Sequence, residues 1–272
     1  MDLPLQTPTA QELVTATEAN YQAYFASFTV LPRIQMWRQP TCTVFIANSA
    51  PGNTILTTHF GETTAAAQIQ ELLEQLAPLV RDIWWQVLPS CQPADLADRL
   101  VAEGLEPLPH ENRPVMTLTL ATRPQAPPLL QGLIIRRVCD TATMHDWTTA
   151  SKQGFGANAE NTQPYHDAYT ALGFAEHATL QHFVGYLAGV PITSATLLIA
   201  GGLAGIYDVS TVPSARRQGL GAAITNACLV TAEIRGYHHA VLHASTEGVR
   251  VYQRLGFREL YREQNFSWQR PE

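Results

Sequence analysis

The chain has 272 residues, of which 46% are hydrophobic, and its formal net charge at pH 7 is −6. This length accommodates one large domain or two of ordinary size, and the composition is that of a globular protein with a substantial core. The negative charge does not suggest a general nucleic-acid-binding surface, and Lys152 is the one lysine available for Schiff-base chemistry.

The cysteines and the N-terminal residues argue against several other classes. Cys42, Cys91, Cys139 and Cys228 are far apart in the sequence and form no CxxC pair, as expected of reduced thiols rather than of a zinc site or a disulfide framework. The opening MDLPLQTPTAQELV has no basic region followed by an apolar core, and no apolar run reaches the length of a membrane span. We expect a cytoplasmic protein without a metal, nucleic-acid or membrane partner; the sequence leaves its oligomeric state open.

Residues 1–122 are expected to form an α/β domain. The predicted elements are a helix at 10–28, a strand at 42–48, a helix at 63–80, a strand at 82–89, a short helix at 93–104 and a strand at 113–120. The second helix is predicted from the helical spacing of its apolar side chains, which are Ile69, Leu72, Leu73 and Leu76. In the short helix, Asp95 stands near the start and Gly104 at the end.

A proline-rich stretch, residues 121–132, interrupts this pattern. Its three prolines cannot continue a helix or a central strand. The stretch is either a domain boundary or a long crossover between strands. We divide the chain into an N-terminal domain at 1–122, a linker at 123–132 and a second domain at 133–272.

Residues 133–272 predict a mixed, mostly antiparallel sheet flanked by helices, a fold that is α/β, or α+β in some schemes. A strand at 133–138 precedes helices at 141–155 and 163–177, and three strands follow between residues 180 and 212. The turns between these strands are short, which implies antiparallel hairpins. A helix at 219–236, a strand at 239–245, a helix at 247–256 and a terminal segment at 257–270 complete the order.

The most informative stretch is VSTVPSARRQGLGAAI, residues 209–224. The helix that follows shows an apolar stripe, so its N-terminus lies near residues 216–221; the stripe is Leu220, Ile224, Ala227, Thr231 and Ile234. Unpaired amides at a helix N-terminus, glycines that allow close approach and two arginines together favour an anion site. A solvated turn with two surface arginines remains the alternative. The P-loop string GxxxxGK[ST] and the Rossmann string GxGxxG are both absent.

This stretch resembles the acyl-CoA loop of the GNAT N-acetyltransferase superfamily, whose signature is [RQ]-x-x-G-x-[GA]. Arg216, Gly219 and Gly221 fill the signature, and Pro213 precedes it as in many members. Downstream, ASTEGVRVYQRLGF resembles the second motif of the family, with Tyr252 among its matching residues. Ser245 stands where many members have asparagine, and this departure puts one CoA hydrogen bond in doubt.

The resemblance implies a GNAT fold and acetyl-CoA as cosubstrate. The pantetheine arm would follow a bulged, splayed strand, and the pyrophosphate would lie on the loop amides. The implied cofactor-binding residues are Val209, Thr211, Val212, Arg216, Arg217, Gln218, Gly219, Leu220, Gly221, Ala222, Ser245 and Tyr252. We expect Gly219 to allow close approach of the phosphate and Gly221 to form the tight start of the helix.

The resemblance also implies direct attack of a primary amine, from a small molecule or a peptide, on the thioester. Tyr252 would be the acid for the thiolate, because a phenol can donate to this leaving group. Asp208 is our choice of base through a water, with a solvent-exposed strand aspartate as the alternative. Tyr207 is expected on the opposite face of the sheet. Phe155, Tyr165 and His166 are candidates to line the acceptor site, whereas His182 and His243 are expected to be structural.

The N-terminal half lacks the acyl-CoA loop signature. Residues 83–120 resemble the closing portion of a GNAT unit, so this half is either a degenerate GNAT-like domain or an unrelated α/β cap. For the whole chain we expect an acetyl-CoA-dependent N-acetyltransferase. The alternative is a non-catalytic acyl-CoA-binding or sensing module with the same fold.

Overall fold

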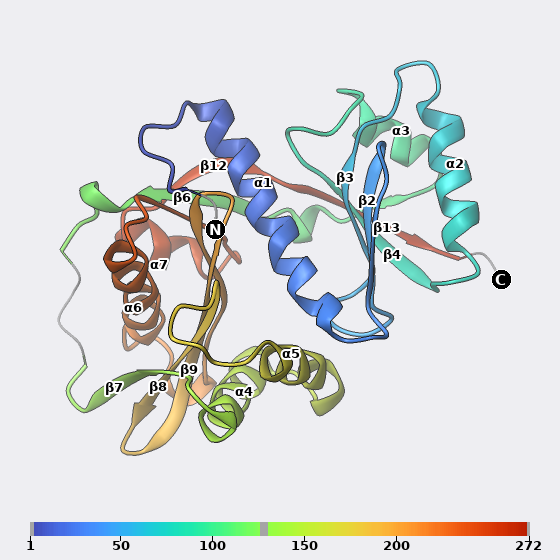
Figure 1. Cartoon of the computed structure of the whole chain (residues 1–272). Helices are drawn as coiled ribbons and strands as arrows, with labels where there is room; N and C mark the ends of the chain where they lie inside the picture. Colours follow the sequence, from blue (N-terminus) through green and yellow to red (C-terminus); the bar gives the residue numbers. More distant parts are fainter. Residues whose placement is uncertain (1–2, 126–129, 271–272) are drawn as a thin grey trace. The chain divides into compact units, whose positions relative to one another are not determined.

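A computed structural model describes residues 3–125 and 130–270 of the chain (Figure 1). The chain forms two compact units that are interleaved along the sequence. Unit 1 comprises residues 1–30 and 114–260, and unit 2 comprises residues 31–113 and 261–272. No helix within the described residues combines the length and the apolar character needed to cross a bilayer.

Unit 1 is built on a seven-stranded sheet with the order β12-β6-β11-β10-β9-β8-β7. Its neighbouring strands pair antiparallel in β7–β8, β8–β9, β9–β10 and β6–β11, whereas β10 and β11 pair parallel. The strands are β6 (Pro114–Thr119), β7 (Leu133–Arg137), β8 (Leu180–Leu187), β9 (Val190–Ala200), β10 (Leu203–Thr211), β11 (His239–His243) and β12 (Arg258–Arg262). The helices are α1 (Ala10–Ser27), α4 (Thr141–Phe155), α5 (Ala159–Leu172), α6 (Leu220–Ile234) and α7 (Val249–Arg254).

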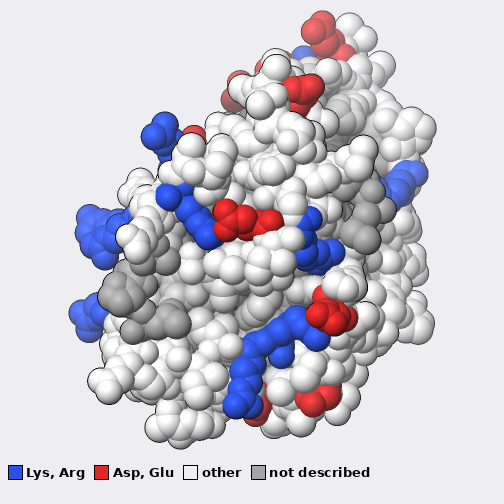
Figure 2. Space-filling model, turned by 60° about the vertical axis from the view of Figure 1, so that its left-hand side comes forward, with Lys and Arg blue, Asp and Glu red and all other residues white. Residues whose placement is uncertain are grey.

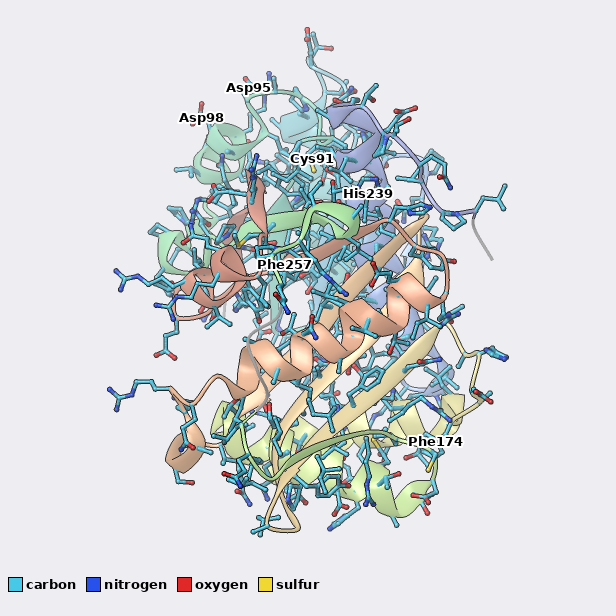
Figure 3. All side chains as sticks on the ribbon, turned by 90° about the vertical axis from the view of Figure 1, so that its left-hand side faces the viewer. Cys91, Asp95, Asp98, Phe174, His239 and Phe257 are labelled. Atoms are coloured by element: carbon cyan, nitrogen blue, oxygen red, sulfur yellow. The ribbon has the colours of Figure 1, made fainter. Side chains whose placement is uncertain are left out.

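Side-chain alternation shows which helices cover which face of this sheet. Ala204 and Ile206 of β10 belong to the apolar cluster formed with α6, which crosses the sheet in Figure 3. The intervening Gly205 and Tyr207 meet Asn20 of α1 instead. α4 lies on the same face as α1, because a Cβ placed on Gly154 would come within 3.0 Å of Ser210 and Thr211 of β10.

Unit 2 contains a six-stranded sheet with the order β1-β2-β3-β4-β13-β5. The strands are β1 (Gln35–Arg38), β2 (Cys42–Ile46), β3 (Thr54–Thr58), β4 (Asp82–Val87), β5 (Glu106–Pro107) and β13 (Gln264–Gln269), and the helices are α2 (Ala65–Leu76) and α3 (Leu96–Ala102). The predicted stripe of α2 is confirmed, because its four apolar residues are all buried. They pack with β2, β3 and β4 in one cluster that includes Trp85.

The two units divide the chain differently from the division expected at residues 122 and 133. The proline-rich stretch lies between β6 and β7, which belong to one sheet, so it is a crossover within unit 1; residues 126–129 of it lie outside the described residues. Strand pairing explains the difference. β6 pairs with β11 of unit 1, whereas β13, from the C-terminal end of the chain, pairs with β4 and β5 of unit 2.

The mixed sheets and the order of the C-terminal elements confirm the expected fold class. Three strands of the N-terminal half, β1, β3 and β5, were not predicted. The stripe expected on α6 is correct for Leu220 and Ile224, but the buried face continues through Cys228, Leu229 and Ala232, whereas Ile234 is 80% exposed. α5 begins at Ala159 rather than near residue 163, because the side chain of Asn158 accepts a hydrogen bond from the amide of Asn161 and caps the helix.

Candidate active site

The N-terminus of α6 offers backbone amides without intrahelical partners. Gly219 is the N-cap residue and provides no side-chain cap. The first α-helical bond in this turn runs from the amide of Ala223 to the carbonyl of Gly219, at 3.0 Å. The amides of Leu220, Gly221 and Ala222 therefore have no acceptor within the helix, and together with the helix dipole they favour an anion.

The two glycines of this loop differ in backbone conformation. Gly219 has φ +82°, a conformation that non-glycine residues rarely adopt, and a Cβ there would meet nothing within 4 Å. Gly219 is therefore needed for the turn into the helix. Gly221 is helical, and a Cβ on it would meet only Oγ1 of Thr211, at 3.9 Å. Its missing side chain leaves open space beside the free amides, as close approach of a ligand requires.

The two arginines differ in what they contact. The guanidinium of Arg216 donates to the backbone carbonyls of Thr211, at 3.2 Å, and Gly154, at 2.8 Å. It thus ties the loop to the ends of β10 and α4. Arg217 is exposed with φ +64°, and Gln218 is exposed beside it. On the face shown in Figure 2, charged side chains lie in small groups of both signs between larger uncharged areas.

β10, which leads into the loop, is both splayed and bulged. It pairs with β11 only over residues 204–206. Its register with β9 shifts between Tyr207 and Ser210 and resumes at Ser210 and Thr211, and the amide of Val212 donates to Ile192. Asp208 and Val209 therefore lie outside both ladders. The bulge and the splay implied by the resemblance are both present.

The bulge also changes where Asp208 points. With φ +52° at Asp208, the alternation of side chains is broken, and the expected separation of Asp208 and Tyr207 onto opposite faces is wrong. The ring of Tyr24 stacks on Tyr207 with a centroid distance of 4.1 Å, and its hydroxyl donates to Oδ1 of Asp208 at 2.7 Å. One aromatic side chain of α1 thus contacts both residues.

Asp208 is a half-buried, hydrogen-bonded carboxylate rather than a solvent-exposed one. Tyr169 of α5 donates to its Oδ2 at 2.8 Å. Burial raises the pKa of Asp208, and the hydrogen bonds from Tyr24, Tyr169 and Thr196 act in the opposite direction. Tyr24 and Tyr169 were not among the predicted site residues. The aromatic residues at helical spacing in YQAYFASF, residues 21–28, are a signal that could have drawn attention to Tyr24.

Tyr252 lies in the apolar cluster on the α6 face. It is 8% exposed, and its ring meets Phe257 edge-on at 5.9 Å. Burial raises the pKa of its phenol, with Cys228 as a second cause, so Tyr252 carries its proton at neutral pH. Ser245 is exposed, and its hydroxyl accepts a hydrogen bond from the amide of Gly248 at 3.2 Å, just before the start of α7.

The three residues suggested for an acceptor site have separate environments. Phe155 is 59% exposed at the end of α4. The ring of Tyr165 packs against Phe28 at 5.1 Å and Tyr169 at 6.1 Å. Nδ1 of His166 is 3.0 Å from the hydroxyl of Thr148. Only Tyr165 therefore adjoins the side chains around Asp208.

His182 lies on the polar side of the sheet in unit 1. It is fully buried, and its Nδ1 is 3.0 Å from the hydroxyl of Thr196. Burial lowers its pKa to about 3, so the ring is neutral at physiological pH. Its ring stacks on Tyr169 at 4.1 Å, so His182 buttresses the residues that surround Asp208.

Comparison with known proteins identifies this architecture. Residues 149–270 match the model of the acetyltransferase (GNAT) domain family. The match covers slightly less than half of the chain and supports the resemblance of its C-terminal part to the GNAT superfamily. The match contains β10, the loop, α6 and α7, and excludes α1. Members of this family generally use acetyl-CoA, and the uncapped α6 N-terminus with open space at Gly221 fits the phosphates of that cosubstrate.

Solved structures extend the likeness to both units. A GCN5-related N-acetyltransferase from Kribbella flavida aligns with TM-score 0.68 and 19% identity over 92% of this chain and 95% of its own. A GCN5-related N-acetyltransferase from Sphaerobacter thermophilus aligns with TM-score 0.65 and 14% identity, over 100% of this chain and 98% of its own. A tandem GNAT protein of the clavulanic acid biosynthesis pathway aligns with TM-score 0.62 and 12% identity, over 99% of this chain and 98% of its own. These identities show the fold alone, which is consistent with two GNAT-like halves. Curated proteins give no significant match.

Proposed function

We propose that the protein is an acetyl-CoA-dependent N-acyltransferase whose acceptor is a primary amine of a small molecule or a peptide. The observation that carries this proposal is the uncapped, glycine-bordered N-terminus of α6 directly after the bulged and splayed β10. An anion site and a strand with interrupted pairing, side by side, suit a ligand that has both a pyrophosphate and an amide-containing arm.

In this proposal the loop and strand share the binding of acetyl-CoA. Amides from Arg217 to Ala222 bind the pyrophosphate, and Arg216 holds the loop in place through its two carbonyl contacts. Backbone groups from Val209 to Val212 bind the pantetheine arm. Ser245 provides an exposed hydroxyl near the start of α7.

Two side chains move the protons of the reaction. Asp208 accepts one proton from the acceptor ammonium, directly or through a water, and later releases it to solvent. The neutral nitrogen then forms the C–N bond as the C–S bond breaks. Tyr252 donates its proton to the departing thiolate and regains one from the nitrogen. One amine proton thus ends on the thiol and one in solvent.

The test measures acetyl-CoA binding by calorimetry and thiol release against a panel of primary amines, including polyamines, amino sugars and peptide N-termini. Thiol release that depends on one amine class would support the proposal. Acetyl-CoA binding without release on any amine would instead favour a non-catalytic acyl-CoA-binding module. Absence of binding would reject both.

A further inference from the structure

Asp208 is held from two helices on one face of the unit 1 sheet. Tyr24 of α1 donates to Oδ1 at 2.7 Å, and Tyr169 of α5 donates to Oδ2 at 2.8 Å. Two hydrogen bonds from opposite partners, one to each oxygen, fix the plane and the direction of a carboxylate. A surface aspartate in a bulge would be free to rotate.

We propose that Tyr24 and Tyr169 are positioning residues that hold Asp208 ionised and oriented toward the ammonium group of the acceptor. This inference rests on the proposed function, because it gives a role to two residues that act through the carboxylate assigned there as the base. It also makes α1, which precedes the matched GNAT segment of residues 149–270, part of the acceptor site.

The direction of these hydrogen bonds follows from the electrostatics. Burial, and then the charge of Asp208, raise the pKa of both phenols well above its ordinary range, so Tyr24 and Tyr169 remain donors at physiological pH. Burial raises the pKa of Asp208, and the hydrogen bonds that the two phenols donate offset part of this effect and favour the ionised carboxylate. Other groups around the three residues are Tyr165 of α5, Tyr207 of β10, Thr196 of β9 and, bonded to Thr196, the neutral His182 of β8.

Among the described residues, the carboxylate of Asp208 has hydrogen-bond donors but no cationic side chain as a partner. Within residues 3–125 and 130–270, the ion pairs join other carboxylates, in Arg99–Asp95, Arg113–Glu111 and Arg123–Glu233. A half-buried negative charge that lacks a cationic partner attracts a cationic ligand.

The experiment compares Tyr24→Phe, Tyr169→Phe and the double variant with the wild type and with Tyr186→Phe. The control removes a similar bond, because the phenol of Tyr186 donates to Oδ2 of Asp146 at 2.8 Å, away from Asp208. The readouts are the pH profile of kcat/KM for the amine, acetyl-CoA affinity and thermal unfolding. Each phenylalanine at Tyr24 or Tyr169 should move the acid limb to higher pH.

The direction of this pH shift follows because the base is active only when it is ionised. Loss of a donor to the carboxylate favours its protonated form, so kcat/KM near pH 6 should fall about tenfold and recover to within about twofold near pH 9. Acetyl-CoA affinity and the Tyr186→Phe profile should stay within about twofold of wild type. A loss of kcat/KM of equal size at every pH, with the acid limb of the profile unmoved, would show a merely structural role and overturn the inference.

A measurement independent of turnover separates this inference from the proposed function. Carbon-13 NMR of aspartate-labelled protein, with Asp208→Asn to assign the signal, reports the titration of Asp208 directly. Tyr24→Phe should shift that titration to higher pH, and Tyr186→Phe should not. An unshifted titration rejects the positioning role even in an active enzyme. A shifted titration in a protein that acetylates no amine supports the positioning role of Tyr24 and rejects the proposed function instead.

Discussion

The two faces of the seven-stranded sheet bury different kinds of side chain. On the α6 face, β9 and β10 contribute Ala195, Leu197, Ala204 and Ile206 to one apolar cluster, each no more than 3% exposed. On the face of α1 and α4, the same strands bury polar groups instead, which are Ser194, Thr196 and Ser210, beside the half-buried Asp208. Most of these polar groups are paired. Ser194, for example, bonds both the carbonyl of Asp208 and the hydroxyl of Ser210.

This contrast separates stability from chemistry. Apolar burial stabilises in proportion to the area removed from water, whereas a buried hydrogen bond adds little net stability but fixes positions. We therefore expect changes on the α6 face to alter mainly the free energy of unfolding, and changes on the other face to alter mainly activity. Tyr252 is the exception to test, because its phenol lies within the apolar cluster.

The largest effect should come from cutting the chain at the proline-rich stretch. A fragment of residues 133–272 lacks β6, which pairs with all five residues of β11 and supplies Met116 and Leu118 to the α6-face cluster. It also lacks α1 on the other face. We expect no cooperative thermal transition by circular dichroism, whereas the full chain should show one. A fragment that melts cooperatively near the full-length midpoint would show that residues 133–272 suffice.

The next largest effect is expected from a substitution that creates a cavity in the apolar cluster. Leu229 of α6 is completely buried, so Leu229→Ala should lower the free energy of unfolding in urea by about 2–5 kcal/mol. Ile234→Ala on the same helix is the matched control, because Ile234 is 80% exposed and should change stability by no more than about 0.5 kcal/mol. The kcat of folded Leu229→Ala should equal that of wild type. A specific loss of kcat would mean that the α6 face shares in catalysis beyond Tyr252.

Tyr252→Phe tests the acid role of the phenol that Tyr252 places in the apolar cluster. Burial raises its pKa, so it remains a proton donor over the working pH range, and its loss should lower kcat about 10–100-fold. Acetyl-CoA affinity by calorimetry should be unchanged. Equal turnover of the variant and the wild type would remove the acid role and leave Tyr252 as a packing residue.

The smallest effects should distinguish the two loop glycines. Gly219→Ala places a side chain at φ +82° and should cost about 1 kcal/mol of stability. Gly221→Ala should leave stability equal or slightly higher, because alanine favours the helix, but should raise the KM for acetyl-CoA by filling the open space. The reverse pattern would restore the roles expected from the sequence, with Gly219 as the residue that phosphate approaches.

Much of the fold was predictable because its signals are local. The stripe of α2, the hairpins of β8 to β10 and the glycine-rich start of α6 are each encoded within a short stretch of neighbouring residues. The division of the chain was not predictable. No local sequence pattern indicates that β6 pairs with β11 or that β13 pairs with β4, because these partners are far apart in the sequence. The proline-rich stretch is compatible with a boundary or a crossover.

The surroundings of Asp208 illustrate the same limit at the level of single residues. Its partner Tyr24 is 184 positions away, and Tyr169 is 39 positions away. The bulge at Asp208 breaks the alternation from which its direction was inferred.

By itself, the sequence determined a mixed sheet with helices and a glycine-rich helix start, because periodicity and glycine spacing act over neighbouring residues. Only the tertiary structure decided which strands share a sheet and which phenols reach Asp208. Those choices depend on pairing and packing between distant segments, which no short stretch of the chain encodes.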